Sequence, residues 1–340
     1  MKRCMFIVML ALALVGISCL RTDNPFAPNG TSLMKYGRGQ YIFMSTFSNV
    51  YRWDLATGNN VKGVLTTNGY EFISLNVQVS KDERYFYTLA QKTAAGYIDL
   101  YRYNIDGTGE ELILAGSAAS TPNLVYPCPN GDLIIKEITG VNSETIVINP
   151  YYATKRDLIG SNINVSVPLA GKAAFYYSTN MVGSGPYTNT YTIKKYDLAA
   201  KTTATIATMV LEFSAPPNPV FSIGPSPDGD KLLIITQTNS ANFLAYMLDV
   251  RSGAAPALIG SITNSVSIGW SPYASPLYMI MSAGGYEIGR ISTANAALTK
   301  TKEFTLAYVM MKWPVSDAFG KMYLVNTNLA ALGAAESMID

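Results

Sequence analysis

Polar turns and short apolar runs alternate along most of the chain. Seven times, a short polar turn is followed within a few residues by a short apolar run, which is the pattern of a hairpin leading into a β-strand. The turns start 40 to 57 residues apart, most of them near 45, and comprise Gly37–Gln40, Ser80–Glu83, Pro129–Asp132, Leu169–Lys172, Ser226–Gly229, Ser271–Ala274 and Val315–Ala318. The predicted strands after them are Tyr41–Met44, Tyr85–Thr88, Leu133–Ile135, Ala173–Tyr176, Leu232–Ile235, Leu277–Ile280 and Met322–Val325.

A second signature follows in most units. A strand ends in Asp or Asn, then comes an aliphatic residue and usually a turn containing Gly, as in Asp54-Leu55, Asn104-Ile105, Asp197-Leu198 and Asp249-Val250. An outer strand completes each unit, and in the fourth unit we expect it over 202–207. The sequence therefore predicts four strands per repeat.

Short strands at this repeat length are typical of the blades of a β-propeller. We expect an all-β propeller of seven four-stranded antiparallel blades over residues 31–340, with six blades and overlapping ends as the alternative. The last blade is predicted to be incomplete, with strands over 307–312 and 322–325. The following segment, Leu329–Ala335, is a poor strand sequence.

The fifth repeat carries the clearest family resemblance. Ser226-Pro227-Asp228-Gly229 with the apolar run to Ile235, followed by Leu248-Asp249-Val250, resembles the blade motif of the TolB-like and WD-type propellers. The resemblance implies a fold, and these families host many functions.

The amino terminus resembles an export signal. Lys2 and Arg3 precede an apolar run from Met5, and small residues stand three and one positions before Cys19, which predicts a signal peptide over 1–18. Val15–Cys19 also resembles a bacterial lipoprotein signal, which implies a lipid on Cys19 and an outer-membrane or cell-surface lipoprotein. Plain secretion or a periplasmic location is the alternative. Residues 19–30 read as a flexible tether to the folded body.

Composition narrows the chemistry. The chain has no His, which excludes Ser-His-Asp and Cys-His nucleophiles and removes the commonest zinc ligand. Without Lys2 and Arg3 the charges balance at 23 basic and 23 acidic residues, so a nucleic-acid partner is not expected. We predict no cofactor, no metal and no disulfide. Cys128, the one cysteine in the predicted propeller, is expected to be a buried apolar residue.

A binding site is expected on the longer loops, which a propeller gathers on one rim. These loops are 91–97, 140–143, 178–189 and 237–242, and the binding residues predicted on them are Tyr97, Asn180, Tyr187, Asn189 and Asn239. The recurring acids of the turns are expected to be structural and comprise Asp54, Asp82, Asp197, Asp228 and Asp249.

These features favour a non-catalytic, envelope-associated protein that binds a protein partner or acts as a scaffold. One alternative is a metal-centred hydrolase of the lactonase type, for which Glu137 and Glu287 are the candidate ligands. The other is a subunit of a surface assembly.

Overall fold

The computed structural model describes most of the chain from Tyr41 onward. The described residues are 41–45, 49–54, 61–66, 71–72, 77–80, 82–91, 96–152, 156–166, 168–169, 172–182, 188–212, 221–226, 229–237, 242–263, 265–270, 276–282, 285–291, 298–305, 315–316, 322–325 and 335–339. The predicted signal peptide and tether, Cys19 included, lie outside these residues, as does the strand predicted over 307–312.

Every regular element in the described part of the chain is a β-strand, and the strands form seven antiparallel sheets. The sheets comprise β1 (Tyr41–Ser45), β2 (Asn49–Asp54) and β3 (Val61–Thr66); β4 (Glu71–Phe72), β5 (Gln78–Val79), β6 (Tyr85–Gln91), β7 (Asp99–Asn104) and β8 (Glu111–Leu114); β9 (Thr121–Pro127), β10 (Leu133–Thr139), β11 (Asn142–Ile148) and β12 (Arg156–Ser161); β13 (Asn164–Val165), β14 (Ala174–Val182), β15 (Thr188–Asp197) and β16 (Thr202–Glu212); β17 (Phe221–Pro225), β18 (Lys231–Gln237), β19 (Asn242–Asp249) and β20 (Ala257–Thr263); β21 (Ser265–Trp270), β22 (Pro276–Ser282), β23 (Gly285–Ile291) and β24 (Leu298–Thr305); and β25 (Val315–Ser316), β26 (Met322–Val325) and β27 (Ala335–Ile339).

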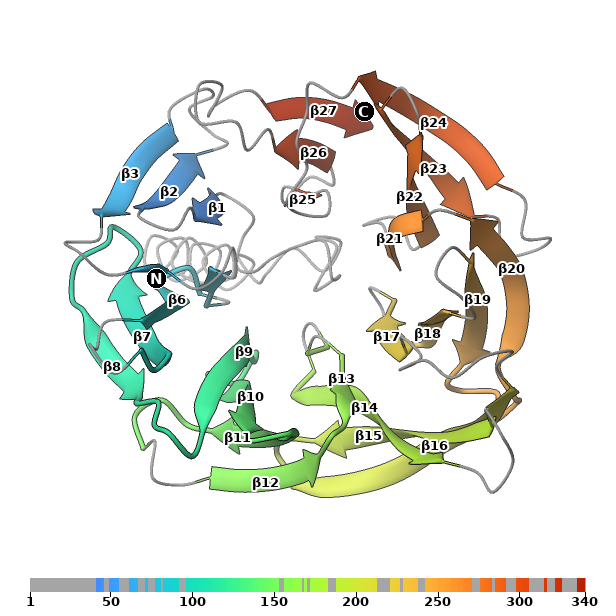
Figure 1. The fold of residues 1–340 in the computed structure, drawn as a ribbon, viewed down its shortest axis with the longest axis horizontal. Coiled ribbons are helices and arrows are strands. Elements are labelled where there is room, and N and C mark those ends of the chain that lie inside the picture. The colour runs from blue at the N-terminus through green and yellow to red at the C-terminus, as the bar shows by residue number, and fades with distance from the viewer. Residues whose placement is uncertain are drawn as a thin grey trace, which may run out of the picture.

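The sheets are the blades of a β-propeller. They stand side by side around a common centre, with the first strand of each complete sheet innermost and the last one outermost (Figure 1). Each of the seven strands predicted from the turn signature is present. Among the described residues, the first and last sheets have three strands each, and no strand of one pairs with the other.

Serine closes the tight turn before the second strand. In the second blade the amide of Ser80 donates to the Tyr85 carbonyl (2.9 Å), and the amide of Tyr85 donates back to Ser80 Oγ (3.0 Å). Ser226 and Lys231 repeat this pair of bonds in the fifth blade, at 2.8 and 2.9 Å. The Ser of the turn motif is therefore the residue that fixes the hairpin.

The aliphatic residue of the second signature ties two turns together. The amide of Ile105 donates to the Arg84 carbonyl (2.9 Å), and Leu198 and Val250 make the equivalent bonds in the fourth and fifth blades. The Leu198 side chain is 5% exposed, so the same residue also contributes to the core.

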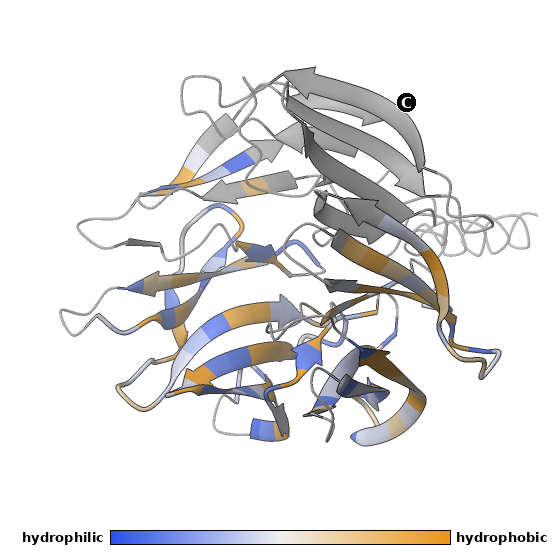
Figure 2. Ribbon diagram, turned by 45° about the vertical axis from the view of Figure 1, so that its right-hand side comes forward, coloured by the Kyte–Doolittle hydropathy of each residue, from blue (hydrophilic) through white to orange (hydrophobic). Residues whose placement is uncertain are grey.

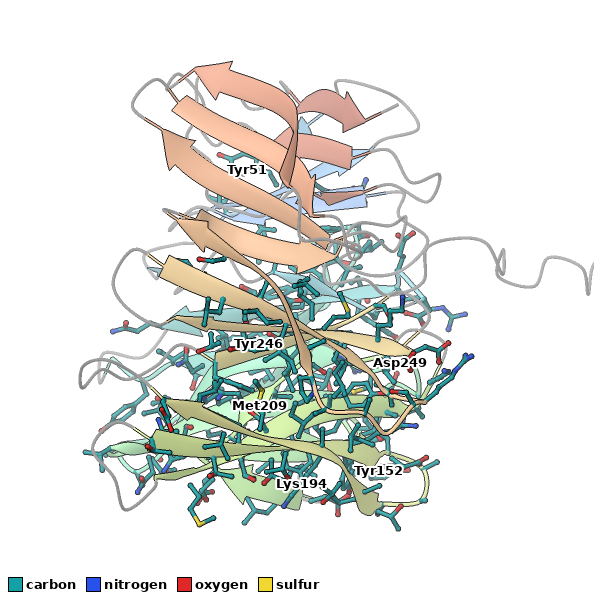
Figure 3. All side chains as sticks on the ribbon, turned by 90° about the vertical axis from the view of Figure 1, so that its right-hand side faces the viewer. Tyr51, Tyr152, Lys194, Met209, Tyr246 and Asp249 are labelled. Carbon is teal, nitrogen blue, oxygen red and sulfur yellow. The ribbon has the colours of Figure 1, made fainter. Side chains whose placement is uncertain are left out.

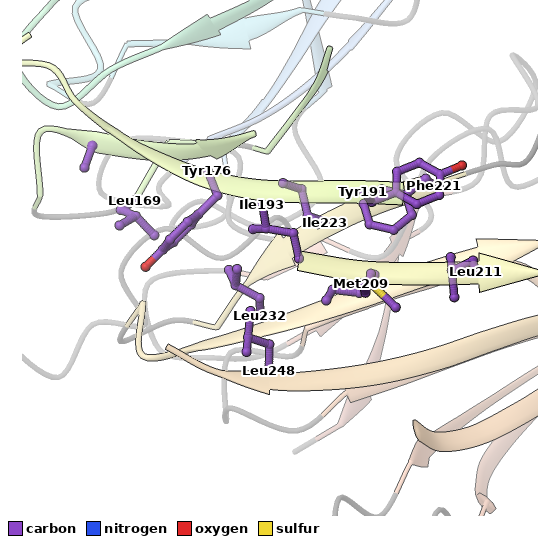
Figure 4. Close-up of a cluster of buried hydrophobic side chains, with 12 residues drawn as sticks. Leu169, Tyr176, Tyr191, Ile193, Met209, Leu211, Phe221, Ile223, Leu232 and Leu248 are labelled. Atoms are coloured by element: carbon purple, nitrogen blue, oxygen red, sulfur yellow. The ribbon is translucent and has the colours of Figure 1, made fainter. Parts of the chain in front are cut away.

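The core lies between neighbouring blades. Apolar and polar residues alternate along many of the strands (Figure 2). The second, third and fourth blades each present one apolar set to the preceding blade and another to the following one. Between the fourth and fifth blades, Tyr191 stacks on Phe221 with ring centroids 3.9 Å apart, and Ile193, Leu232 and Leu248 pack beside them (Figure 4).

A β-bulge recurs at the outer strand of each of the first six sheets. The outer strand gains one residue relative to its neighbour between Val50/Tyr51, Leu100/Tyr101, Thr145/Ile146, Ile193/Lys194, Ala245/Tyr246 and Ile288/Gly289. The residues left without an opposite partner are Val64, Ile113, Ile159, Ile206, Ile259 and Thr301. Five of the six are β-branched aliphatics that pack into or against the core, so the bulge turns an outer-strand side chain inward.

Candidate partner-binding surface

The tight turns between the first and second strands and between the third and fourth strands lie on one side of the ring, here called the turn rim. Figure 3 shows Asp249 and Tyr152, both from such turns, on the same side of the molecule. Asp249 Oδ1 accepts from the amide of Arg251 (2.9 Å), and Asp197 Oδ1 accepts from the amides of Ala199 and Ala200.

Asp82 caps its own turn in the same way and accepts from the Ser80 hydroxyl and the Arg84 amide. The hydrogen bonds that Asp197 accepts from the amides of Ala200 and Ala199 hold its pKa below the usual value. The structural role expected for Asp82, Asp197 and Asp249 is thus observed, while the side chains of Asp54 and Asp228 lie outside the described part of the structure.

On this rim, Arg102 of β7 is the centre of a cluster of charged and aromatic side chains. Arg102 lies opposite Tyr87 of β6 and Glu111 of β8, and its side chain is 8% exposed. The guanidinium donates from Nε to Glu111 Oε2 (3.0 Å), and Nη2 contacts the same oxygen. A carboxylate therefore compensates a buried positive charge.

Two tyrosine rings enclose the same guanidinium. The ring of Tyr85, in the same blade, lies 4.6 Å from Arg102 Cζ, and the ring of Tyr151, in the next blade, lies 4.7 Å from it. Both distances are within the range of cation–π attraction. The Tyr151 amide donates to Asn149 Oδ1 (3.0 Å), which fixes the turn that carries this ring. Arg102 thus joins the second and third blades.

The electrostatics of the cluster keep Arg102 charged. Burial alone lowers the pKa of Arg102, but the hydrogen bond and negative charge of Glu111 outweigh burial and raise it. Burial raises the pKa of Tyr87 to about 12. A hydrogen bond with Tyr151 raises the pKa of Tyr85. At neutral pH, Tyr85 and Tyr87 are therefore neutral and Arg102 is positive.

Two tyrosines at this site are exposed to solvent. Tyr151 is 63% exposed and Tyr152, which follows it in the turn, is 61% exposed. Tyrosine and arginine dominate the energetics of protein–protein interfaces. We call Tyr85, Arg102, Tyr151 and Tyr152 the aromatic patch.

Sequence reasoning identified Tyr85 and Arg102 only as strand residues. The only sequence signal for this site was a charged residue, Arg102, in the middle of the strand Asp99–Asn104, whose residues are buried as far as Tyr103. The contact with Tyr151 could not be read from the sequence, because it joins residues of two different blades.

Three of the five predicted binding residues lie in the described part of the structure, in two different blades. Tyr97, in the second blade, is half-buried; Asn180, in the fourth, is exposed; and Asn189 is buried, with Nδ2 donating to Tyr191 Oη at 3.5 Å. Tyr187 and Asn239 lie outside the described residues. Of the three described residues, Asn180 and Asn189 belong to the same hairpin, formed by β14 and β15.

The loop predicted over 178–189 is mostly strand. β14 continues to Val182 and β15 begins at Thr188, with Val182 paired to Asn189. Thr, Tyr and Met favour strands, and cross-strand pairing extends as far as such residues continue. The boundary prediction was wrong because it weighted the Asn and Gly residues over the β-formers around them.

Neither of the candidate metal ligands lies on the innermost strand of its sheet. Glu137 is on β10, the second strand of its sheet, is 2% exposed and accepts from Arg156 Nη1 at 3.1 Å. Glu287 is on β23, the third strand of its sheet. Among the described residues, no three His, Cys, Asp or Glu side chains are grouped so that they could hold a metal ion.

Cys128 is buried, as predicted, and burial raises the pKa of its thiol well above the usual value. The reactive thiolate is therefore disfavoured. Within the described part of the chain, no helix is long and apolar enough to cross a membrane.

Comparison with known proteins shows the fold. No family model and no curated protein matches the sequence. An oligogalacturonate lyase in complex with manganese superposes with a TM-score of 0.62 at 10% identity, covering 90% of this chain and 88% of the lyase.

The β-propeller domain of the trilobed protease from Pyrococcus furiosus, described as having an open velcro topology, gives a TM-score of 0.56 at 10% identity and covers 88% of this chain and 93% of that domain. TolB from Acinetobacter baumannii gives 0.49 at 15% identity, with 78% of this chain and 64% of TolB covered. The predicted β-propeller fold is confirmed.

Proposed function

We propose that this chain is a non-catalytic, envelope-associated β-propeller that binds a protein partner through the aromatic patch. The observation that carries the proposal is the pair of exposed rings of Tyr151 and Tyr152 beside a buried, charge-compensated arginine. Exposed tyrosines lose little conformational entropy on binding and present both an apolar ring and a hydroxyl. Because Arg102 holds Tyr151 from the neighbouring blade, part of the ordering cost of binding is already met by the fold.

The remaining chemistry supports binding over catalysis. The chain has no His, and the recurring turn acids Asp82, Asp197 and Asp249 are engaged in capping their own turns. Glu137 is engaged by Arg156.

Affinity capture from envelope extracts tests this proposal. The full-length protein should retain one specific protein, and the double variant Tyr151→Ala/Tyr152→Ala should lose it. Val141→Ser is the matched control, because Val141 is a 99% exposed apolar residue of the β10–β11 turn, on the opposite side from the tight turns. Retention by the double variant together with loss by the control would place the site on the side of the ring opposite the turn rim, where Val141 lies.

A metal-centred hydrolase is the second candidate, and the similarity to a manganese-bound lyase favours it at the level of fold. Metal analysis of the purified protein discriminates between the two. A stoichiometric divalent metal together with turnover of a small substrate would support the enzyme and contradict the binding proposal.

We also propose export and lipidation at Cys19, on the strength of the amino-terminal pattern. Labelling with a radioactive fatty acid should mark the wild-type protein and leave Cys19→Ser unlabelled. If the wild-type protein is exported but unlabelled, plain secretion is the correct account.

A further inference from the structure

The outer edge of the fourth blade is an open strand edge. β16 (Thr202–Glu212) is the longest of the described strands, with 11 residues, and stands last in the order β13-β14-β15-β16. No other strand in the described part of the chain pairs with its outer side. Such an edge presents a row of backbone N–H and C=O groups that can accept another strand.

β16 lacks two of the features that usually protect an edge, namely charged residues and proline within the strand. From Thr202 to Leu211 it contains no charged residue and no proline. By contrast, β12 begins with Arg156 and Asp157, and β8 has four residues and begins with Glu111. β20 is also uncharged, but it has seven residues and follows directly after Pro256. Charges and prolines are two of the means by which proteins block edge pairing.

Charges stand at the two ends of β16. Lys201 precedes the strand, is 63% exposed and pairs with Asp157 of the preceding blade (2.7 Å), while Glu212 ends the strand and is exposed. If two copies of β16 pair antiparallel with Lys201 opposite Glu212, a positive and a negative charge meet at both ends. In this register Thr203 lies opposite Val210, and Thr205 lies opposite Thr208.

The β-bulge makes this register possible. Alternate residues of β15 share one face of the sheet. Those on one face are Tyr196, Lys194, Thr192 and Thr190, and their partners on β16 are, in the same order, Thr203, Thr205, Thr208 and Val210. These four residues share a face only because Ile206 has no opposite residue in β15. Residues opposite each other in a two-fold antiparallel pair must point to the same face. Without the bulge, Thr203 and Val210 would point to opposite faces.

We propose that two copies of this chain associate through antiparallel pairing of their β16 edges, related by a two-fold axis between Ile206 and Ala207. The contact is isologous, because each copy offers the same strand to the other. Val210, which is 60% exposed, is then covered by the partner's Thr203. This contact uses the outside of the fourth blade and is independent of the aromatic patch between the second and third blades.

Cysteine cross-linking tests the register. In the full-length protein, Thr203→Cys/Val210→Cys should give a disulfide-linked dimer under mild oxidation, because residues opposite each other in an antiparallel pair meet the distance needed for a disulfide. An equal mixture of the two single variants should cross-link as well. Each single variant alone should give only the wild-type background, because equal positions lie several residues apart. Equal cross-linking by a single variant would overturn the register.

Sedimentation of the full-length protein tests the association itself. The wild type should show a concentration-dependent dimer, and Val210→Lys should weaken it at least about tenfold, because lysine on an edge opposes strand pairing. Leu258→Lys is the matched control, since Leu258 is 57% exposed on the outer strand of the fifth blade. Thermal unfolding of both variants checks that they fold. A wild type that remains monomeric, or a dimer indifferent to Val210→Lys, contradicts the proposal.

Discussion

At the scale of single residues, the contacts between blades depend on close approach of backbone to backbone. Gly107 has φ +90, and its turn lies against β3 of the preceding blade. A Cβ on Gly107 would lie 1.7 Å from the Val64 carbonyl oxygen. Gly131 has a similar φ of +88, but no described atom lies within 4 Å of the equivalent position. Comparing alanine substitutions at the two glycines therefore separates the cost of backbone strain, which applies to both, from the cost of a steric clash, which applies only to Gly107.

We expect Gly107→Ala to lower the free energy of unfolding by at least about 2 kcal/mol, because a left-handed conformation and a clash add together. Gly131→Ala should cost about 1 kcal/mol, which is the conformational term alone. Urea unfolding of both variants measures the difference. Equal costs would mean that the contact with Val64 is absent in solution.

Buried tyrosines give the fold an alkaline limit. Burial raises the pKa of Tyr87 and of Tyr176 to about 12, from a usual value of 10.0. A group whose pKa is raised by folding stabilises the fold fully below its unfolded value and loses this contribution as pH rises through the folded value. Stability should therefore fall between about pH 10 and pH 12.

We expect Tyr87→Phe/Tyr176→Phe to reduce that alkaline loss, because phenylalanine has no proton to release. The midpoints of urea unfolding, measured across this alkaline range, give the dependence of stability on pH. Tyr152→Phe is the control, because this side chain is 61% exposed. An unchanged slope in the double variant would show that other groups set the alkaline limit.

At the scale of elements, the bulge of the outer strands is the repeat that the sequence did not reveal. The turn motifs predict the second and third strands of a blade, because the residues of these turns form hydrogen bonds with groups only a few residues away. The bulge leaves a weaker trace, such as Leu112-Ile113 and Leu258-Ile259, in which the first residue is exposed and the second is buried. Hydrophobicity alone does not distinguish the two residues.

The bulge predicts opposite outcomes for two neighbouring residues. Ile113→Ala should lower the free energy of unfolding by about 2 to 4 kcal/mol, because the side chain is 5% exposed in the core between the second and third blades. Leu112→Ala should change it by less than about 0.5 kcal/mol, since Leu112 is 51% exposed. Urea unfolding of both variants decides. A larger cost for Leu112→Ala would reverse the assigned faces.

At the scale of the whole molecule, the repeat specified the fold more completely than the site. All seven strands expected after the tight turns are present, and the final sheet has three strands in the described residues. The aromatic patch was not predicted, because Arg102 and Tyr151 meet only once two blades stand side by side. Local patterns report hydrogen bonds within a hairpin, whereas contacts between blades depend on the assembled ring.

Two separate surfaces of the ring are thus proposed to bind, one to a partner protein and the other to a second copy of this chain. The aromatic patch lies on the turn rim of the second and third blades, and the β16 edge lies on the outside of the fourth. Occupation of one leaves the other accessible, so a dimer would offer two aromatic patches. Partner binding should then gain from the presence of two sites.

Site-specific photo-cross-linking in cells tests the central claim most directly. A photoreactive phenylalanine in place of Tyr152 should form a covalent adduct with one partner protein, whereas the same residue in place of Val141 should form none. An adduct from position 141 only, or no adduct from either position while the purified protein turns over a substrate, would contradict partner binding at the aromatic patch.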